Sequence, residues 1–277
     1  MTTSYAPSAV GSSIQHRKAI LLMICATSLW SIAGVFTRQL EAARGFEITF
    51  WRSLFAALFV AGYLLLQKRF THSLRAAGRW GLFSGFLWCV MFSCFMIALS
   101  LTTVANTLVV MSIAPLLTAL LAFLVLKQII SLRTWLAILL AVFGMVMMFA
   151  SGFNHSSQQQ FFGMLIALAV PVASSVNLIA LKKAGQQVDL IPALFIGGVM
   201  SCCLMLPFAW PMQASLHDLA ILALLGVFQL GFPCMLMLRA APHLSAPEVS
   251  LLSLLEVLLG PIWAWLGAGE VPHNATL

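Results

Sequence analysis

Residues 104–126 read VANTLVVMSIAPLLTALLAFLVL, a run of 23 positions without one charged side chain. A helix that crosses the hydrocarbon core of a bilayer needs about 20 mostly apolar residues, whereas a transmembrane strand needs only about 10. The length of this run therefore predicts a membrane helix. Pro115 stands near its middle and predicts a local break in that helix, because proline lacks the backbone N–H of an intrahelical hydrogen bond.

The composition of the whole chain agrees with a membrane location. Of its 277 residues, 62% are hydrophobic and 8% are charged, against about 25% charged in an average soluble protein. So little polar material cannot cover the surface of a soluble protein of this size. We therefore set aside soluble enzymes, nucleic-acid-binding proteins and disordered scaffolds, and the lipid bilayer is the expected partner.

Nine apolar stretches approach or reach the length of a spanning helix, and the short connections make successive helices antiparallel neighbours. The expected fold class is all-α, a polytopic membrane protein with nine spanning helices. The first stretch is too long for the hydrophobic region of a signal peptide. The nine stretches are 19–37, 46–66, 80–100, 104–126, 134–150, 161–181, 190–210, 219–238 and 246–266.

Basic residues give an expected orientation. The net charge is +7, and most Lys and Arg residues lie in alternate connections between the apolar stretches. By the positive-inside rule the basic side is cytoplasmic, so we expect an integral protein of a bacterial inner membrane with a cytoplasmic N-terminus. The basic side carries Arg17, Lys18, Lys68, Arg69, Arg75, Arg79, Lys127, Arg133, Lys182, Lys183 and Arg239, and the opposite side carries Arg38 and Arg44.

A polar segment at 151–160 (SGFNHSSQQQ) divides the chain into units of 19–150 and 161–277. Five helices are an odd number, so two such units in tandem have opposite orientations, an arrangement of secondary transporters. A weak internal match supports the division: aligning Ala105 with Ala246 superimposes two apolar helices and sets Pro115 over Glu256.

Two stretches resemble the EamA-like form of the drug/metabolite transporter superfamily. They are ALSLTTVANTLVVMSIAPLLTALLAFLVLKQIISLRTWLAILLAVFGMVMM at 98–148 and SAPEVSLLSLLEVLLGPIWAWLGAGEVP at 245–272. The resemblance implies a ten-helix carrier of two inverted five-helix repeats. It also implies a tenth helix after Pro272, where this sequence has only five more residues. We expect a truncated chain, the alternative being a partner that covers the exposed face.

Two charged residues within the apolar stretches are candidates for the transport site. Glu256 lies near the middle of 246–266, where a charge is costly unless it faces a cavity or a partner. It could bind a cationic substrate group or a coupling proton, and the alternative is a protonated carboxyl bonded to a neighbouring helix. Arg52 lies about 9 Å into its helix at 1.5 Å per residue. It could bind an anion, pair with Glu256 or Glu47, or extend to the membrane surface.

The remaining candidates are amides, prolines and tryptophans within the spans. Asn106, Asn177 and Gln229 could bind substrate or only hold helices together. Proline frees a backbone carbonyl and kinks its helix, and such breaks often line the path of a carrier, although prolines are common in membrane helices generally. Trp30 and Trp88 could line a cavity or anchor a helix at the membrane interface. The candidate hinges are Pro115, Pro171, Pro233 and Pro261.

The sequence has no Walker A loop, Rossmann glycine pattern, HExxH or GxSxG motif, and its cysteines have no zinc-ligand spacing. We therefore expect no cofactor, no metal and no nucleic-acid partner, and a pump that hydrolyses ATP by itself is excluded. The expected function is secondary transport of a small metabolite or drug-like solute by alternating access. Export is the expected direction, and proton coupling is one way to drive it. The alternatives are a non-transporting helical receptor or assembly subunit and an intramembrane enzyme with Glu256 as its acid.

Overall fold

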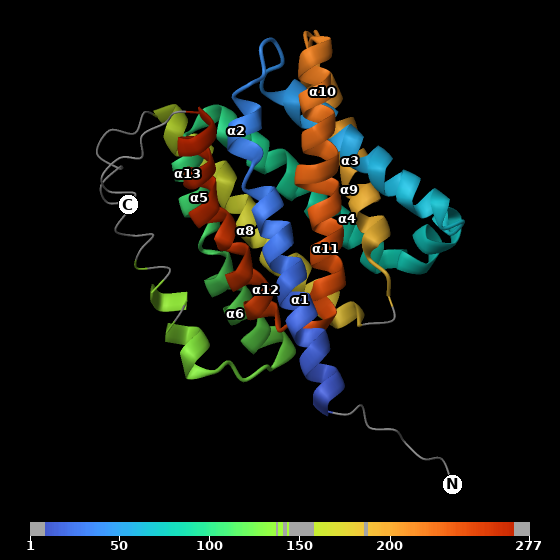
Figure 1. Ribbon diagram of the computed structural model, residues 1–277, viewed down its shortest axis with the longest axis vertical. Helices are drawn as coiled ribbons and strands as arrows, with labels where there is room; N and C mark the ends of the chain where they lie inside the picture. The colour runs from blue at the N-terminus through green and yellow to red at the C-terminus, as the bar shows by residue number, and fades with distance from the viewer. Residues whose placement is uncertain (1–8, 137, 141–142, 144–157, 186–187, 269–277) are drawn as a thin grey trace.

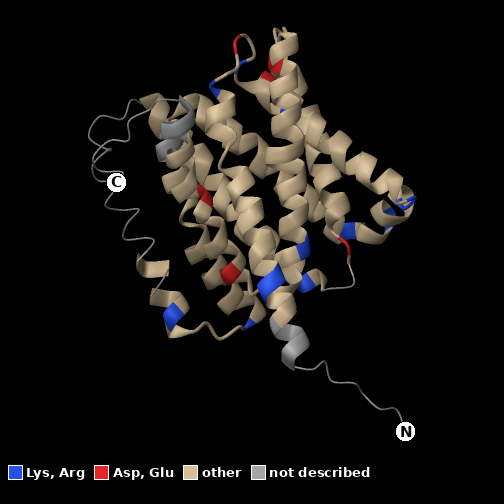
Figure 2. Cartoon of the chain, in the orientation of Figure 1, with Lys and Arg blue, Asp and Glu red and all other residues tan. Residues whose placement is uncertain are grey.

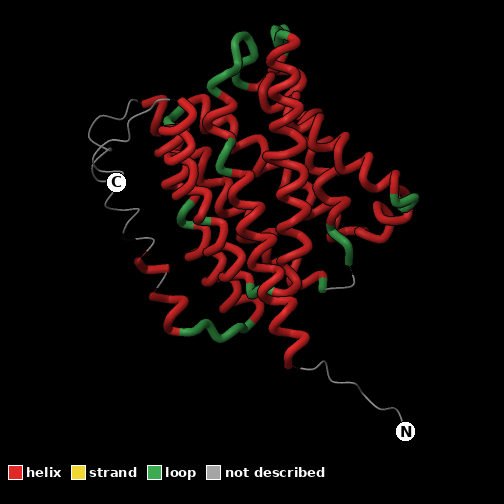
Figure 3. The backbone as a smooth tube through the Cα atoms, in the orientation of Figure 1, coloured by secondary structure: helices red, strands yellow, loops and turns green. Residues whose placement is uncertain are grey.

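The computed structural model describes residues 9–268 apart from 137, 141–142, 144–157 and 186–187. Its regular structure is helical throughout, and no strand occurs among these residues (Figure 3). The elements are α1 (Ala9–Trp30), α2 (Ala33–Thr37), α3 (Phe46–Leu66), α4 (Phe70–Leu101), α5 (Val104–Met111), α6 (Ala114–Leu126), α8 (Gln158–Ala184), α9 (Ile191–Ala209), α10 (Leu216–Leu224), η2 (Leu225–Gly231), α11 (Phe232–Ala240), η3 (Ala241–His243), α12 (Ala246–Ser253) and α13 (Leu255–Ala268).

Seven helical segments of the described chain are long and apolar enough to cross a membrane, and they coincide with seven of the nine expected spans. The all-α, polytopic fold class is confirmed. The expected span 134–150 lies largely outside the described residues. The expected span 246–266 is present as α12 and α13, which are separated at Leu254 and are not among the seven. The seven are Ile14–Thr37, Phe46–Leu66, Phe70–Leu101, Asn106–Leu126, Gln158–Ala184, Ile191–Ala209 and Leu216–His243.

Three expected helices are each divided into two pieces. α1 gives way to α2 after Trp30, α5 to α6 after Met111, and α12 to α13 after Ser253 (Figure 1). A serine at each break donates its hydroxyl to a carbonyl three or four residues earlier, a contact that bends helices. The three contacts are Ser31 to Ser28 at 2.7 Å, Ser112 to Val109 at 2.7 Å and Ser253 to Val249 at 2.9 Å.

The first pieces of two broken helices correspond. α5 and α12 each have eight residues, and each follows a hydroxyl N-cap, Thr103 in the first and Ser245 in the second. Each N-cap side chain accepts from the backbone N–H three residues later. Counted from these two N-caps, Val104 stands at the position of Ala246, one residue from the register in which Ala105 aligns with Ala246. The same count sets Ala114 at the position of Glu256.

Helix α9 lies between α3 and α4, and its glycines allow the close approach. A Cβ atom on Gly197 would lie 2.5 Å from Cβ of Trp88 in α4, and one on Gly198 would lie 2.9 Å from Cβ of Ala57 in α3. The hydroxyl of Ser201 in α9 lies 3.0 Å from those of Ser53 and Ser93. Small residues and hydroxyl contacts of this kind hold membrane helices together, because no hydrophobic driving force brings apolar side chains together within lipid.

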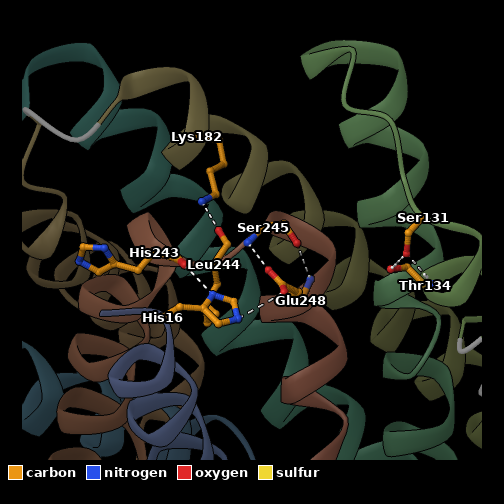
Figure 4. Close-up of polar contacts among 8 residues, drawn as sticks. All are labelled: His16, Ser131, Thr134, Lys182, His243, Leu244, Ser245 and Glu248. Atoms are coloured by element: carbon orange, nitrogen blue, oxygen red, sulfur yellow. Dashed lines mark hydrogen bonds and ion pairs between the residues drawn. The ribbon is translucent and has the colours of Figure 1, made fainter. Parts of the chain in front are cut away.

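Polar contacts hold the connections at both ends of the bundle. At one end, the buried carboxylate of Asp218 accepts from the backbone N–H groups of residues 41, 42 and 43 at 2.8–3.0 Å. At the other end, Lys182 in α8 donates to the carbonyl oxygens of Ala241 and Leu244, and His16 in α1 lies 3.8 Å from Glu248 in α12 (Figure 4). Figure 2 shows Lys and Arg mainly at this second end, where α1 begins, and on the α3–α4 hairpin.

Candidate functional site

A cavity of about 160 Å³ lies inside the bundle, where the broken helices meet. Trp30 ends α1, Met111 ends α5, and Ser253 ends α12, and all three line the cavity. The other walls come from α3, α4, the first residue of α6, α8, the η2–α11 segment and α13. A helix that is interrupted within a membrane exposes backbone groups that lack intrahelical partners, which is tolerated where they are buried in protein or line a cavity.

Arg52 extends from α3 to the cavity wall, and its side chain is only 2% exposed. Its Nη1 atom donates to Oε1 of Gln229 at 3.2 Å, and the guanidinium carbon lies 5.7 Å from the ring centroid of Phe95. The Nε atom has no hydrogen-bond partner among the described residues. Burial excludes the extension to the membrane surface that was one alternative for Arg52. For the alternative of a pair with Glu47, the described residues show no such ion pair, and Oε1 of Glu47 accepts from the backbone N–H groups of Gln213 and Ala214.

Gln229 lies in η2, a π-helical segment in the middle of a spanning helix. Its Nε2 atom donates to the carbonyl oxygen of Trp30 at 3.2 Å, while its Oε1 atom accepts from Arg52. Local π segments are often found at functional sites. Gly226 lets η2 approach α3 closely, because a Cβ atom there would lie 2.5 Å from Cβ of Phe55 and 2.7 Å from the carbonyl oxygen of Arg52. Pro233 follows at the start of α11.

Glu256 is the second residue of α13 and contributes the negative charge of the cavity. The side chain is half-buried, and it lines the same cavity as Arg52. The two side chains are not in direct contact, since the ion pairs found among the described residues join His16 to Glu248 and His217 to Glu41. Glu256, two residues after the break at Leu254, therefore lines the cavity without forming an ion pair with Arg52 in the described structure.

Aromatic and apolar side chains form most of the remaining wall. Trp88, Phe92 and Phe95 lie on one face of α4, at the spacing of successive helical turns, and all three are buried. Trp88 is 4% exposed, and its Nε1 atom has no hydrogen-bond partner in the described part of the chain. Such a wall suits the apolar body of a solute, while the few polar groups fix its orientation.

The structure brings five of the six residues predicted for binding or coupling into this cavity: Trp30, Arg52, Asn177, Gln229 and Glu256. Asn177 in α8 also accepts from Ser84 in α4 at 2.7 Å, so it joins two helices as well as lining the cavity. Asn106, the sixth, lies outside this group. Its Nδ2 atom donates to Thr102 at 3.0 Å, and the residue does not line the cavity.

The predicted hinge prolines lie in different surroundings. Pro171 lines the cavity from within α8. Pro115 and Pro233 are buried at the starts of α6 and α11, each next to a residue of the cavity wall. Pro261 belongs to α13, but its side chain is outside the described part of the structure.

Several cavity residues were not predicted from the sequence. Ser174, Ser250 and Ser253 line it, as do the aromatic rings of Phe92 and Phe95. A serine or phenylalanine within an apolar helix carries no signal of its own, because both residues are common at helix contacts and in lipid-facing surfaces. The only available hint was the spacing of Trp88, Phe92 and Phe95 along one helical face.

A polytopic helical bundle that encloses a charged cavity among interrupted helices has the architecture of a membrane carrier. The comparison with known families is specific. Residues 17–150 and 161–277 match the EamA-like transporter family, and the chain belongs to that family. It is therefore a membrane transporter and an integral membrane protein, and the predicted family is confirmed.

The individual relatives share a low sequence identity with this chain. The pseudopaline exporter CntI of Pseudomonas aeruginosa is 22% identical over 267 residues, which cover 94% of this chain and 91% of the exporter. The exporter of the same name from a second strain of that species gives the same values. A crystal structure that is 19% identical superposes with a TM-score of 0.74, over 94% of this chain and 91% of that one. That likeness shows a shared fold.

Proposed function

We propose that the chain exports a small solute by alternating access, with the cavity between α1, α3, α4, α5–α6, α8, η2–α11 and α12–α13 as the substrate site. The observation that carries this proposal is the pair of opposite charges, Arg52 and Glu256, that line one cavity inside an otherwise apolar bundle. Intramembrane charges are costly, and they are retained where they act on a substrate or an ion. The name of the CntI relative supports export as the direction.

The two units of the proposed transporter are 19–150 and 161–277, arranged as inverted repeats. The corresponding N-caps Thr103 and Ser245, and the corresponding breaks after α5 and α12, support this assignment. The family matches of 17–150 and 161–277 have similar bounds. In carriers of this kind, one repeat moves against the other around a fixed central site. The breaks after Trp30, Met111 and Ser253 would then supply the flexible points.

Within this site, Glu256 binds a cationic substrate group or a coupling proton, and Arg52 binds an anionic group. Gln229 positions Arg52, and Trp30 and Asn177 contact the solute. Pro171 and the buried prolines Pro115 and Pro233 lie at or beside the cavity wall and act as hinges. No chemical conversion of the solute is proposed, so the protein acts as a carrier and not as an enzyme.

The proposed location is a bacterial inner membrane, with the N-terminus in the cytoplasm. The basic residues gather mainly at the end where α1 begins and on the α3–α4 hairpin (Figure 2). The positive-inside rule places such residues in the cytoplasm. In this orientation, the contacts of Lys182 and His16 lie at the cytoplasmic end of the cavity.

Counterflow in proteoliposomes tests the transport function. The full chain is reconstituted and loaded with unlabelled L-leucine, L-leucinamide, 4-methylpentanoate or glucose, and uptake of the same labelled compound is followed. These compounds are zwitterionic, cationic, anionic and neutral. A carrier exchanges at least one of them, whereas a receptor or assembly subunit exchanges none. Absence of exchange for all four would contradict the proposal.

The Glu256→Gln variant tests the role of the carboxylate in the same assay. We expect at least tenfold slower exchange and a loss of any pH dependence, because glutamine cannot carry the charge or a coupling proton. Glu248→Gln is the matched control, since Glu248 belongs to α12 and does not line the cavity. Wild-type flux with an unchanged pH profile in Glu256→Gln would remove Glu256 from the site.

A further inference from the structure

A group of exposed basic side chains lies where α3 ends and α4 begins. It consists of Lys68, Arg69, Arg75 and Arg79, which we call the basic turn. The hairpin of α3 and α4 extends from the side of the bundle (Figure 1), and Lys and Arg gather at its tip (Figure 2). None of the four side chains forms a hydrogen bond or an ion pair with another residue that the structure describes.

No acidic side chain of the described chain pairs with the basic turn. The sequence has no acidic residue between Glu47 and Asp189. Oδ1 of Asp189, in the connection that precedes α9, accepts from the backbone N–H of Ile191. Arg239 differs from the basic turn, because its guanidinium donates to the hydroxyl of Tyr63. The four charges of the basic turn therefore have no comparable partner within the described protein.

A short separate helix carries part of the basic turn. α4 is interrupted at Gly78, whose φ of 51° and ψ of −141° are not helical. A Cβ atom there would meet no atom within 4 Å, so the glycine is required by the backbone conformation and not by packing. Residues 70–77 thus form a helix of their own, which changes direction at Gly78 before the spanning part of α4.

One face of this short helix packs on the protein and the other is exposed. Ser73 and Ala77 are buried, and the ring centroid of Phe70 lies 5.3 Å from that of Phe195 in α9. Positions 70, 73 and 77 share one helical face, and Arg75 lies on the opposite face and is exposed. Helices with one apolar face and one basic face are typical of segments that lie in the plane of a membrane surface.

The residues on both sides of the basic turn place it at the edge of the hydrocarbon. Leu65 and Leu66 before it are exposed, and so are Leu82 and Phe83 after it. In a membrane protein such exposed apolar side chains face lipid. Trp80, which is also exposed, follows the basic turn directly, and tryptophan is enriched where the hydrocarbon meets the headgroups. The basic turn therefore lies at the depth of the lipid headgroups.

We propose that the basic turn is a binding surface for anionic phospholipids, with the headgroup phosphates bound by Arg75 and Arg79 and by the neighbouring Lys68 and Arg69. Guanidinium groups bind phosphate oxygens through two parallel hydrogen bonds. An anionic headgroup is favoured over a zwitterionic one, which carries its own positive charge beside the phosphate. Each Lys or Arg near an anionic membrane surface strengthens the attraction about fivefold. This inference is independent of the transported solute.

Quenching of Trp80 by brominated lipids tests this inference. The full chain is reconstituted in phosphatidylcholine with a small fraction of brominated phosphatidylglycerol or of brominated phosphatidylcholine. The difference in fluorescence between the wild type and Trp80→Phe isolates the signal of Trp80. We expect brominated phosphatidylglycerol to match the quenching given by about a fivefold larger fraction of brominated phosphatidylcholine. The preference should fall as salt is added. Equal quenching by the two lipids would overturn the inference.

Paired substitutions separate the basic turn from net charge. Arg75→Gln with Arg79→Gln should abolish the preference for phosphatidylglycerol, and Arg75→Lys with Arg79→Lys should retain most of it. Lys127→Gln with Arg133→Gln is the matched control, because it removes two exposed basic residues from another connection of the same side. An equal loss in the control would contradict a local surface. If the glutamine variant does not fold, the comparison of the two lipids in the wild type decides the outcome.

A soluble phosphate compound separates the lipid from a free anion. sn-Glycerol 3-phosphate carries the same phosphate chemistry without acyl chains, and it is added at constant ionic strength. We expect it to leave the preference of Trp80 for brominated phosphatidylglycerol unchanged, because the lipid is held at the membrane surface beside the basic turn. Displacement of the lipid by this compound would assign the basic turn to a soluble phosphate ligand and overturn the assignment to phospholipid.

Discussion

Arg52 in α3 and Gln229 in η2 are joined by a hydrogen bond of 3.2 Å across 177 positions of sequence. Gln229 also donates to the carbonyl oxygen of Trp30, so one amide joins three helices at the cavity wall. An amide suits this position because it donates and accepts at the same time. The contact holds the guanidinium at the cavity while its Nε atom stays unpaired.

Replacing Gln229 by leucine should destabilise the protein and slow transport. The substitution leaves the Nη1 atom of Arg52 and the carbonyl oxygen of Trp30 without this partner, and a buried unpaired group costs about 1–3 kcal/mol. Thermal unfolding in detergent and counterflow measure the two effects. Gln229→Glu keeps the acceptor for Arg52 and should retain more stability than the leucine variant. A wild-type unfolding temperature in Gln229→Leu would contradict the assigned contact.

Replacing Gly197 by alanine should disrupt the contact between α9 and α4. The new Cβ atom would lie 2.5 Å from Cβ of Trp88 and 2.8 Å from the carbonyl oxygen of Gly85, and neither neighbour can move freely. Overpacking of this kind costs about 1–3 kcal/mol, measured as the free energy of unfolding. Gly62→Ala is the control, because a Cβ atom there meets no atom within 4 Å. Equal stability of the two variants would be inconsistent with the packing described.

Replacing Asp218 by alanine should loosen the connection that precedes α3. Its carboxylate accepts from three successive backbone N–H groups, at residues 41–43, and from Ser215. Loss of these contacts should lower the free energy of unfolding by at least about 2 kcal/mol, because bonds to a charged acceptor are strong. Limited proteolysis should also become faster between 38 and 45. Asp189→Ala, which removes one hydrogen bond from the backbone N–H of Ile191 to an exposed residue, should cost about 1 kcal/mol or less.

Replacing Lys182 by methionine should release the connection between α11 and α12. Its ammonium donates to the carbonyl oxygens of Ala241 and Leu244, which lie just before the N-cap Ser245 (Figure 4). We expect a loss of about 1–3 kcal/mol in stability. Lys183→Met is the control, because Lys183 is the exposed neighbour and its replacement should change stability by less than about 0.5 kcal/mol. Identical unfolding curves for the two variants would show that the ammonium contacts are unimportant.

The positions of the helices could be predicted from the sequence, because a helix that crosses the bilayer needs an apolar run as long as the hydrocarbon core is thick. The interruptions were less visible. Pro115 gave a direct signal for the break before α6, whereas Ser31 and Leu254 gave none. Whether a serine bends a helix depends on the carbonyl that its hydroxyl reaches, and the same residue elsewhere leaves the helix straight.

Several residues of the candidate site could be predicted from the sequence, but not which of them meet in space. Arg52 and Glu256 attract attention as charges in apolar helices, and this argument needs no tertiary structure. Asn106 is also a polar residue in an apolar stretch, yet its amide donates to Thr102, the C-cap of the preceding helix α4. The unpaired donors at Arg52 and Trp88 could not be found from sequence, since a missing partner is a property of the surroundings.

The sequence by itself determined that this chain is a helical membrane protein, where the seven described helices long enough to cross a bilayer lie, and which few charges they carry. These properties are local, because each depends only on the transfer of one segment from water to lipid. Only the tertiary structure decided that Arg52, Gln229 and Trp30 meet, although they are separated by up to 199 positions. In lipid, helices associate through close packing and individual hydrogen bonds, and these contacts depend on the shape of both partners.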